Sequence, residues 1–250
     1  MDTRSLTALV TGANRGLGLE FVRQLLAAGD HVVATCRHPG KATALNLLAG
    51  EYPGRLHVLP LDVAEPKSHA ELARELPLVL DEGDDGAPGR IDLLVNNAGV
   101  LHSGERFGSL TRANLDDSFH INAAGPLLLT QALAPLLADG DSAQDRPGAR
   151  VVNLSSPLGS IASTTRFGTP SYNISKAALN MATALLAQAL AGRGIVVVAL
   201  SPGWVRTDMG GEGAELEPAD SVADLLRVAQ ALTPADSGRF LDRGGAPLPW

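Results

Sequence analysis

The apolar residues of the chain gather into short runs, which are separated by longer amphipathic segments. Within the runs, apolar residues occupy successive positions instead of alternating with polar ones, as strands buried between two helical layers require. The runs therefore predict strands of a mostly parallel sheet. Their ranges are Leu6–Val10, His31–Cys36, Leu56–Leu61, Ile91–Val95, Arg150–Leu154, Ile195–Leu200 and Arg239–Leu241.

The segments between the runs have apolar residues at helical spacing. They predict helices over Leu17–Ala28, Ala42–Leu48, Glu71–Leu80, Thr111–Ala138, Ser171–Ala191 and Ser221–Leu232. Two polar stretches with Gly and Pro, Asp81–Gly89 and Asp139–Gly148, are predicted to be surface loops. Repeated βαβ units indicate an α/β fold, a Rossmann-like doubly wound sheet of seven strands flanked by helices on both faces. No change in composition divides residues 1–250, so we expect a single domain.

Composition narrows the range of partners. The net charge is −7 and no run of Lys or Arg occurs, which argues against nucleic acid and favours a small-molecule partner. One cysteine, no signal-peptide pattern and no apolar stretch of about 20 residues predict a cytoplasmic protein without membrane spans. The six His residues are scattered, so we expect no metal site.

A glycine-rich segment, Thr11–Gly18, follows the first predicted strand and opens the first predicted helix. At such a position backbone N–H groups and the helix dipole can receive a pyrophosphate. The spacing is Gly-x3-Gly-x-Gly, a variant of the dinucleotide fingerprint, and the alternative is a tight turn whose glycines serve only packing. The cofactor-binding candidates here are Gly12, Asn14, Arg15, Gly16, Leu17 and Gly18.

The end of the second predicted strand bears on the choice between NAD and NADP(H). It reads Thr35-Cys36-Arg37 and has no carboxylate to bind a ribose 2′-hydroxyl. Arg37, helped by Arg15, can pair instead with a 2′-phosphate, so NADP(H) is favoured. The alternative for both arginines is a solvated surface charge.

Tyr172 and Lys176 stand four positions apart in a predicted helix and so share one face. A lysine ammonium close to a phenol lowers the phenol pKa, which suits proton donation during the reduction of a carbonyl. Chance spacing is the alternative for this pair taken alone.

Several motifs occur together in an order that resembles the short-chain dehydrogenase/reductase family across nearly the whole chain. They are Thr11–Gly18, Asn96-Asn97-Ala98-Gly99, Asn122, Ser155-Ser156, Tyr172-x3-Lys176 and Pro202-Gly203. Thr35-Cys36-Arg37, Ser155–Ser160, Pro202–Gly211 and the ending Ser237–Phe240 with Pro249-Trp250 resemble the C-factor and sniffer-type carbonyl reductase branch. The resemblance implies an NADPH-dependent reductase of ketones, aldehydes or quinones.

The resemblance also implies a role for each matching residue. Tyr172 would donate the proton, Ser156 would bind the carbonyl oxygen, Lys176 would hold the nicotinamide ribose, and Asn122 would anchor a proton-relaying water. Ser155 would be a structural partner. The remaining cofactor contacts it implies are Asp62 at the adenine ring, Asn97, Ala98 and Gly99 at the adenosine ribose, and Val205 and Thr207 at the nicotinamide carboxamide, with Val63, Pro202 and Gly203 as further cofactor-binding candidates. For Asn122 the alternative is a residue that caps or bends its helix.

Ser156 and Tyr172 are sixteen positions apart, a few more than most of the family uses. The loop Pro157–Ser171, with Arg166 and Phe167, and the acidic segment Met209–Glu217 are therefore candidate lids that set substrate shape. His102 and Trp204 are further candidates for substrate contact, with packing or solvent exposure as the alternative.

Three other functions stay open at this stage: an alcohol dehydrogenase working in the oxidative direction, a C-factor-like signalling protein that keeps the nucleotide pocket, and a purely structural βα protein. Assembly is open as well. Apolar residues on more than one face of two predicted helices favour a homodimer or homotetramer, whereas sniffer-type reductases can be monomeric. These residues are Leu127, Leu128, Leu133, Leu136, Leu137, Leu179, Leu185 and Leu186.

Overall fold

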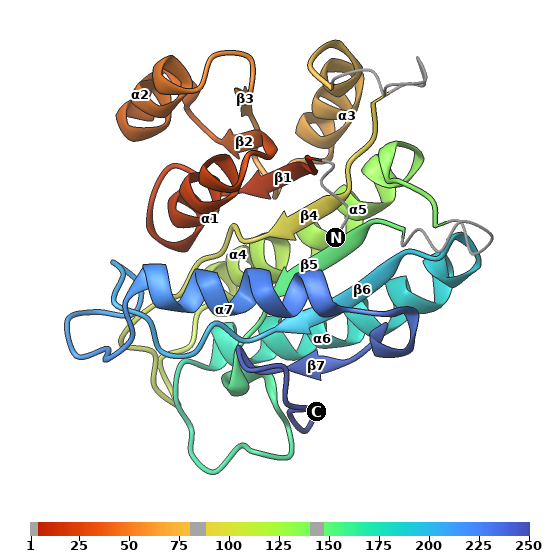
Figure 1. The fold of residues 1–250 in the computed structure, drawn as a ribbon. Coiled ribbons are helices and arrows are strands. Elements are labelled where there is room, and N and C mark those ends of the chain that lie inside the picture. The colour runs from red at the N-terminus through yellow and green to blue at the C-terminus, as the bar shows by residue number, and fades with distance from the viewer. Residues whose placement is uncertain (1–4, 81–88, 141–147) are drawn as a thin grey trace.

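A computed structural model describes residues 5–80, 89–140 and 148–250, whose strands form one sheet between two layers of helices (Figure 1). The sheet has seven strands in the order β3-β2-β1-β4-β5-β6-β7, and each neighbouring pair is parallel. The predicted Rossmann-like sheet is confirmed. Its strands are β1 Thr7–Thr11, β2 His31–Cys36, β3 Leu56–Pro60, β4 Leu93–Asn96, β5 Arg150–Leu154, β6 Val196–Leu200 and β7 Phe240–Leu241.

Two of the predicted strands, β2 and β5, have the predicted bounds, and the others differ by one or two residues at an end. Ile91, predicted to begin the fourth strand, instead forms an isolated bridge with Leu137 ahead of β4. The predicted surface loops Asp81–Gly89 and Asp139–Gly148 lie largely outside the described residues.

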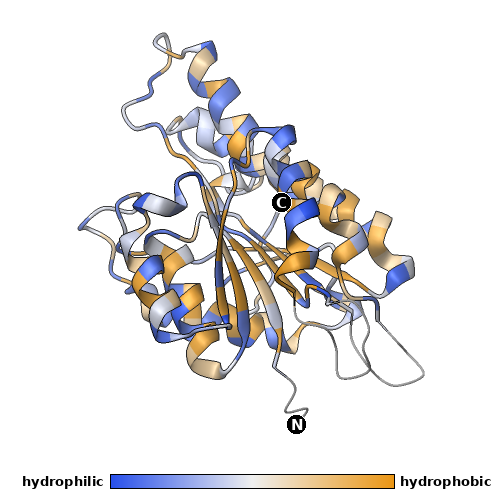
Figure 2. Cartoon of the chain, turned by 90° about the horizontal axis from the view of Figure 1, so that it is seen from above, coloured by the Kyte–Doolittle hydropathy of each residue, from blue (hydrophilic) through white to orange (hydrophobic). Residues whose placement is uncertain are grey.

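The two faces of the sheet carry separate apolar cores, because successive side chains of a strand point to opposite faces. Ala8 and Val10 of β1 belong to one core, whereas Leu9 belongs to the other. The strands are mostly apolar and lie between helices whose outer faces carry polar residues (Figure 2). The first core includes residues of α1 Gly16–Ala28, α2 Thr43–Glu51 and α7 Pro218–Ala231, and the second those of α3 Pro66–Glu75, α5 Gly125–Leu133 and α6 Pro170–Leu190.

The helix predicted over Thr111–Ala138 is interrupted. It consists of α4 (Arg112–Phe119), a π-helical turn (His120–Ala124), α5 and a 3₁₀ turn (Ala134–Leu136). Pro126 has no N–H to donate to the carbonyl of Asn122, so a regular α-helix cannot run through this point. The interruption places Asn122 in the π-helical turn.

Helix α6 corrects a prediction about membrane segments. Pro170–Arg193 is long and apolar enough, by length and composition alone, to span a membrane, contrary to the expectation that no such stretch exists. In the fold this helix packs against β6, α4 and α5, and half of its most apolar window is buried. The buried half, which includes Leu179, Leu186 and Leu190, belongs to the core.

The strand order reverses between β1 and β4, since the chain leaves β1 toward β2 on one side and returns to β4 on the other. In open parallel sheets, ligands bind outside the carboxyl ends of the strands at such a point. The glycine-rich loop after β1 and the loops after β2, β4, β5 and β6 all meet at this edge.

Candidate functional site

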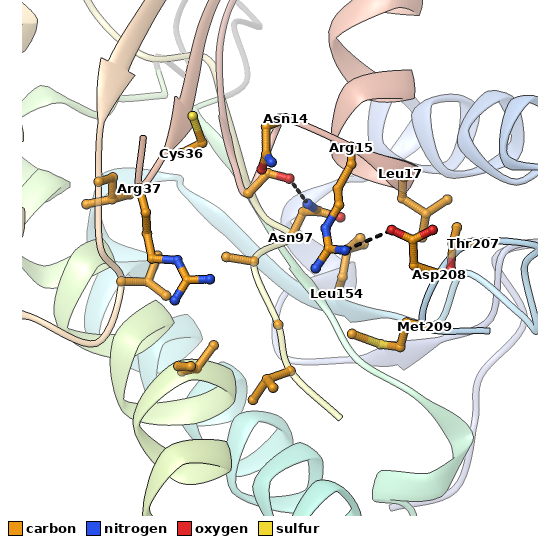
Figure 3. Close-up of a pocket in the computed structure, with 18 of the residues that line it drawn as sticks. Asn14, Arg15, Leu17, Cys36, Arg37, Asn97, Leu154, Thr207, Asp208 and Met209 are labelled. Carbon is orange, nitrogen blue, oxygen red and sulfur yellow. Dashed lines mark hydrogen bonds and ion pairs between the residues drawn. The ribbon is translucent and has the colours of Figure 1, made fainter. Parts of the chain in front are cut away.

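A cleft of ≈ 610 Å³ opens at the carboxyl edge of the sheet (Figure 3). This volume lies within the range of small-molecule and cofactor sites. Most of the predicted cofactor-binding residues line it: Gly12, Asn14, Arg15, Gly16, Leu17, Arg37, Asp62, Val63, Asn97, Ala98, Gly99, Tyr172, Lys176, Pro202 and Thr207.

Three predicted cofactor residues, Gly18, Gly203 and Val205, are not among the residues that line the cleft. A Cβ atom on Gly18 would lie 2.5 Å from Asn97 Nδ2, so glycine is required there for packing. Val205 is only 4% exposed and forms an isolated bridge with Leu216. For Gly18, the packing alternative describes the structure better than a phosphate contact does.

The glycine-rich loop is held in place by the segment after β4. Asn97 Nδ2 donates to the carbonyls of Thr11 (2.7 Å) and Gly12 (3.1 Å), and the hydroxyl of Thr11 accepts from the backbone N–H groups of Asn97 and Ala98, each at 3.0 Å. Gly12 has a φ of 63° and lies against Ala98, where a Cβ would come within 2.9 Å of its Cα. The Asn97 side chain thus shapes the loop, and the backbone of both segments faces the cleft.

Basic side chains gather at the end of the cleft beside β2. Arg37, His38 and Lys41 line it there. Arg37 is exposed and forms no hydrogen bond or ion pair with other described parts of the chain, so its guanidinium is available to an anion. Sequence reasoning missed Lys41, although its position four residues after Arg37 is a usable signal. This end of the cleft therefore suits a phosphate.

Arg15 behaves differently from the prediction. Its Nη1 lies 2.8 Å from Asp208 Oδ2, so the pair joins the glycine-rich loop to the neighbouring loop after β6 (Figure 3). Both side chains are largely exposed, at 70% and 76%. In this structure Arg15 is paired with a carboxylate and not held ready for a 2′-phosphate.

The reacting end of the cleft brings together Ser156, Tyr172 and Lys176. The hydroxyls of Ser156, after β5, and Tyr172, in the first turn of α6, share a hydrogen bond. Lys176 Nζ lies 5.5 Å from the centroid of the Tyr172 ring and donates to the carbonyl of Leu154 at 2.6 Å. The predicted triplet therefore shares one location.

Burial dominates the protonation of this triplet. Burial raises the pKa of Tyr172 to about 12, and the hydrogen bond with Ser156 offsets only part of that rise. Burial lowers the pKa of Lys176 to about 8. The predicted lowering of the Tyr172 pKa by Lys176 is wrong for this structure, because the ammonium is directed at the Leu154 carbonyl and desolvation of the phenol outweighs it. At neutral pH the phenol is protonated.

Asn122 is fully buried, and its side-chain amide forms hydrogen bonds with other residues of the chain. Its Oδ1 accepts from the N–H of Val100 at 2.8 Å, and its Nδ2 donates to the carbonyl of Val100 at 2.8 Å and to Ser175 Oγ at 2.9 Å. The side chain thus joins the segment after β4 to α6.

Ser155 and the substrate-facing candidates also have defined partners. Ser155 Oγ donates to Asn180 Oδ1 at 2.7 Å, as a structural partner would. His102 Nε2 lies 2.9 Å from Asp117 Oδ2, and Asp117 lines the cleft. Trp204 donates its indole N–H to the carbonyl of Gly210 at 2.9 Å, which closes the turn that begins the Met209–Glu217 segment.

Among the described residues, no group of three or more His, Cys, Asp or Glu side chains is arranged to hold a metal ion. The cleft is lined by glycine backbone, basic side chains and the buried Tyr172 and Lys176, and Ser156, which is not among the lining residues, lies beside Tyr172.

The fold and the cleft define a Rossmann-like α/β protein with its ligand site at the switch point of the sheet. Comparison with known proteins identifies the group: a family model described as short chain dehydrogenase matches residues 6–217, and the chain belongs to this family. Its relatives include the C-signal of Myxococcus xanthus, which is 44% identical over 162 residues, or 65% of this chain and 94% of that one.

Two solved structures of relatives resemble the whole chain. Carbonyl reductase Sniffer of D. melanogaster has a TM-score of 0.89 and 32% identity, with 99% of this chain and 100% of that chain covered. An NADPH-bound carbonyl reductase from chicken fatty liver has a TM-score of 0.87 and 36% identity, with the same coverage of both chains. The resemblance to the sniffer and C-factor branch is confirmed, and the protein is an oxidoreductase of the short-chain dehydrogenase family.

Proposed function

We propose that the protein is an NADPH-dependent carbonyl reductase in which Tyr172 protonates the substrate oxygen. The observation that carries this proposal is the contact of Ser156 with the buried Tyr172, whose hydroxyls are hydrogen-bonded to each other and whose phenol is protonated at neutral pH. A neutral phenol beside a second hydroxyl is the donor set that a carbonyl oxygen needs as it becomes an alkoxide. The similarity to carbonyl reductases along the full chain supports it.

The cleft fits a nicotinamide dinucleotide phosphate. Gly12 and Gly16 leave backbone exposed at the start of α1, where a pyrophosphate is favoured. Arg37 and Lys41 lie at the end where a 2′-phosphate would bind. Lys176 lies beside Tyr172 at the other end, so the reacting end and the phosphate end belong to one cleft.

When bound in the cleft, NADPH would supply the hydride that reduces the carbonyl carbon. Ser156 and Tyr172 bind the carbonyl oxygen, and the Tyr172 proton moves to it as charge develops there. Lys176 then faces a phenolate, and a charged ammonium at this point would stabilise it until solvent returns the proton. Asn122 fixes the backbone of Val100 next to α6 and so keeps this end of the cleft in shape.

The test is NADPH oxidation against a panel of aldehydes, ketones and quinones, run beside the same panel with NADH and the matching alcohols with NADP⁺. Faster turnover with NADPH and carbonyls supports the proposal. Turnover with alcohols alone would support the oxidative alternative, and cofactor binding without any turnover would support the signalling alternative.

Three further expectations stay predictions: a single domain over residues 1–250, a cytoplasmic location, and an assembly of two or four subunits.

A further inference from the structure

Helix α6, which carries Tyr172 and Lys176, begins without a cap of its own. Its N-cap residue, Thr169, has a left-handed backbone (φ 42°), which among the described non-glycine residues occurs only here, and it precedes Pro170. Its hydroxyl bonds to the side chain of Asn173 and not to a backbone N–H. The first N–H groups of a helix need partners, so another group must supply one.

Glu105, which lies 66 positions earlier in the chain, supplies that partner. Its Oε2 accepts from the backbone N–H of Ser171 at 3.1 Å and from the Ser171 hydroxyl at 2.7 Å. Its Oε1 accepts from Asn114 Nδ2 at 3.4 Å. A carboxylate at this place also complements the positive end of the helix dipole.

The ionisation of Glu105 agrees with this role. Partial burial raises the pKa of its carboxyl, but the hydrogen bonds from Ser171 and Asn114 and the nearby His102 more than offset that, and the net pKa is lowered. Glu105 is therefore a carboxylate at neutral pH, the form that accepts both bonds from Ser171.

The cap that Glu105 provides lies next to Tyr172, the proposed proton donor. Ser171 directly precedes Tyr172, and the carbonyl of Tyr172 accepts from Ser175 Oγ at 2.7 Å. Ser175 in turn accepts from Asn122. The turn that carries Tyr172 is thus held from one side by Glu105 and from the other by Ser175. The segments of Glu105 and of Thr169 also meet through Phe107 and Phe167, whose rings are perpendicular with centroids 5.7 Å apart.

We propose that Glu105 is a positioning residue, which sets the place of the Tyr172 hydroxyl by capping α6 from the loop after β4. The proposal rests on the proposed function for its catalytic consequence, but the capping itself can be measured without turnover. It assigns no chemical step to Glu105.

The kinetic test compares Glu105→Ala with Glu105→Gln. Glu105→Ala is expected to lower kcat on the order of tenfold while NADPH affinity changes less than about twofold, because a small displacement of the phenol reduces rate more than binding. Glu105→Gln is expected to restore kcat, since its amide oxygen can accept from Ser171 and its NH₂ group can donate to a reoriented Asn114. Asp116→Asn, which removes an exposed carboxylate paired with Arg112, is the matched control and should leave kcat unchanged.

A spectroscopic test does not depend on activity. The chain has two tyrosines, so ¹³Cζ-labelled tyrosine gives one signal for Tyr172 and one for Tyr52 as an internal control. Glu105→Ala is expected to move the Tyr172 signal and its titration and to leave Tyr52 unchanged. If Glu105→Ala fails to fold, Ser171→Ala takes its place, because it removes only the 2.7 Å hydroxyl bond.

Unchanged kcat together with an unchanged Tyr172 signal in the folded variant would overturn the proposal. A loss of rate that Glu105→Gln shares in full would do the same. A wild-type protein that reduces no carbonyl would overturn the proposed function instead, and the Tyr172 signal would still decide whether Glu105 positions this residue.

Discussion

Arg15 and Asp208 form an ion pair of 2.8 Å between two neighbouring loops that line the cleft. The sequence predicts Arg15 as a partner of the cofactor 2′-phosphate, so the two interactions compete for one guanidinium. Because both side chains are largely exposed, the ion pair contributes less than about 1 kcal/mol to the contact between the two loops. A doubly charged phosphate can therefore displace Asp208.

Asp208→Asn should strengthen NADPH binding, since it frees Arg15. We expect the NADPH dissociation constant to fall roughly two- to fivefold and that of NADH to stay the same, measured by fluorescence titration at low salt. The gain should shrink at high salt because both partners are exposed. Glu71→Gln, which removes an exposed ion pair with Lys67 on α3, is the matched control. An equal gain for both cofactors would mean that Arg15 does not discriminate between them.

Arg37→Asp should reverse or abolish the preference for NADPH. Arg37 lines the cleft and has no ion-pair partner in the described parts of the chain, so its loss leaves the 2′-phosphate facing a new carboxylate. We expect NADPH binding to weaken by about 1.5–3 kcal/mol, and NADH binding to remain. Arg74→Asp on α3 makes the same charge change on an exposed helix and should affect neither cofactor. Equal losses for NADPH and NADH would make Arg37 a structural residue.

Residues around the cleft show which features of the fold and the site can be predicted from the sequence. The strands follow from runs of Val and Leu, and the shared location of Ser156, Tyr172 and Lys176 follows from their order. The ionisation of the triplet does not follow from the sequence, because the pKa of Tyr172 depends on burial by segments that are distant along the chain. The cap of α6 by Glu105 is also absent from local sequence, since it joins residues 66 positions apart.

The number of subunits is a second property that the sequence alone does not determine. Leucines on more than one face of a helix suggested a partner subunit, but Leu133, Leu137, Leu179 and Leu186 are buried within the chain itself. Of the eight leucines, only Leu128 and Leu185 are exposed, at 38% and 58%. A helix packed between a sheet and other helices buries several faces, so its sequence alone cannot separate an inner contact from a subunit contact.

Tyr172→Phe should separate binding from chemistry. The change keeps the ring and removes the proposed proton donor, so NADPH binding should stay within about twofold while kcat falls by roughly 10²- to 10⁴-fold. Ser156→Ala should lower kcat by a smaller factor, because Tyr172 still donates. Tyr52→Phe, at the end of α2, is the control for loss of a tyrosine hydroxyl. Near-normal turnover in Tyr172→Phe with saturating NADPH would rule out the proposed mechanism.

Lys176 should make stability depend on pH in a direction set by its buried position. Burial lowers its pKa to about 8 in the folded chain, from an ordinary value of 10.5. Between these two pH values the unfolded chain binds more protons than the folded one, so the free energy of unfolding contributed by this group rises with pH. The raised pKa of Tyr172 has the opposite effect, but only above its ordinary value of 10.

Lys176→Met removes this dependence while keeping an unbranched side chain. Between pH 8 and pH 10 the wild type should gain about 2–3 kcal/mol of stability relative to the variant, as an upper value, measured by urea unfolding at each pH. At pH 7 the variant should be the more stable of the two, although it loses turnover, because it no longer carries the cost of burying an ammonium. Lys67→Met, at an exposed lysine of α3, should give a curve parallel to that of the wild type. If the stability curve of Lys176→Met also runs parallel to that of the wild type, Lys176 has the same pKa in the folded and unfolded chains. Burial would then not shift its pKa, and the prediction would be wrong.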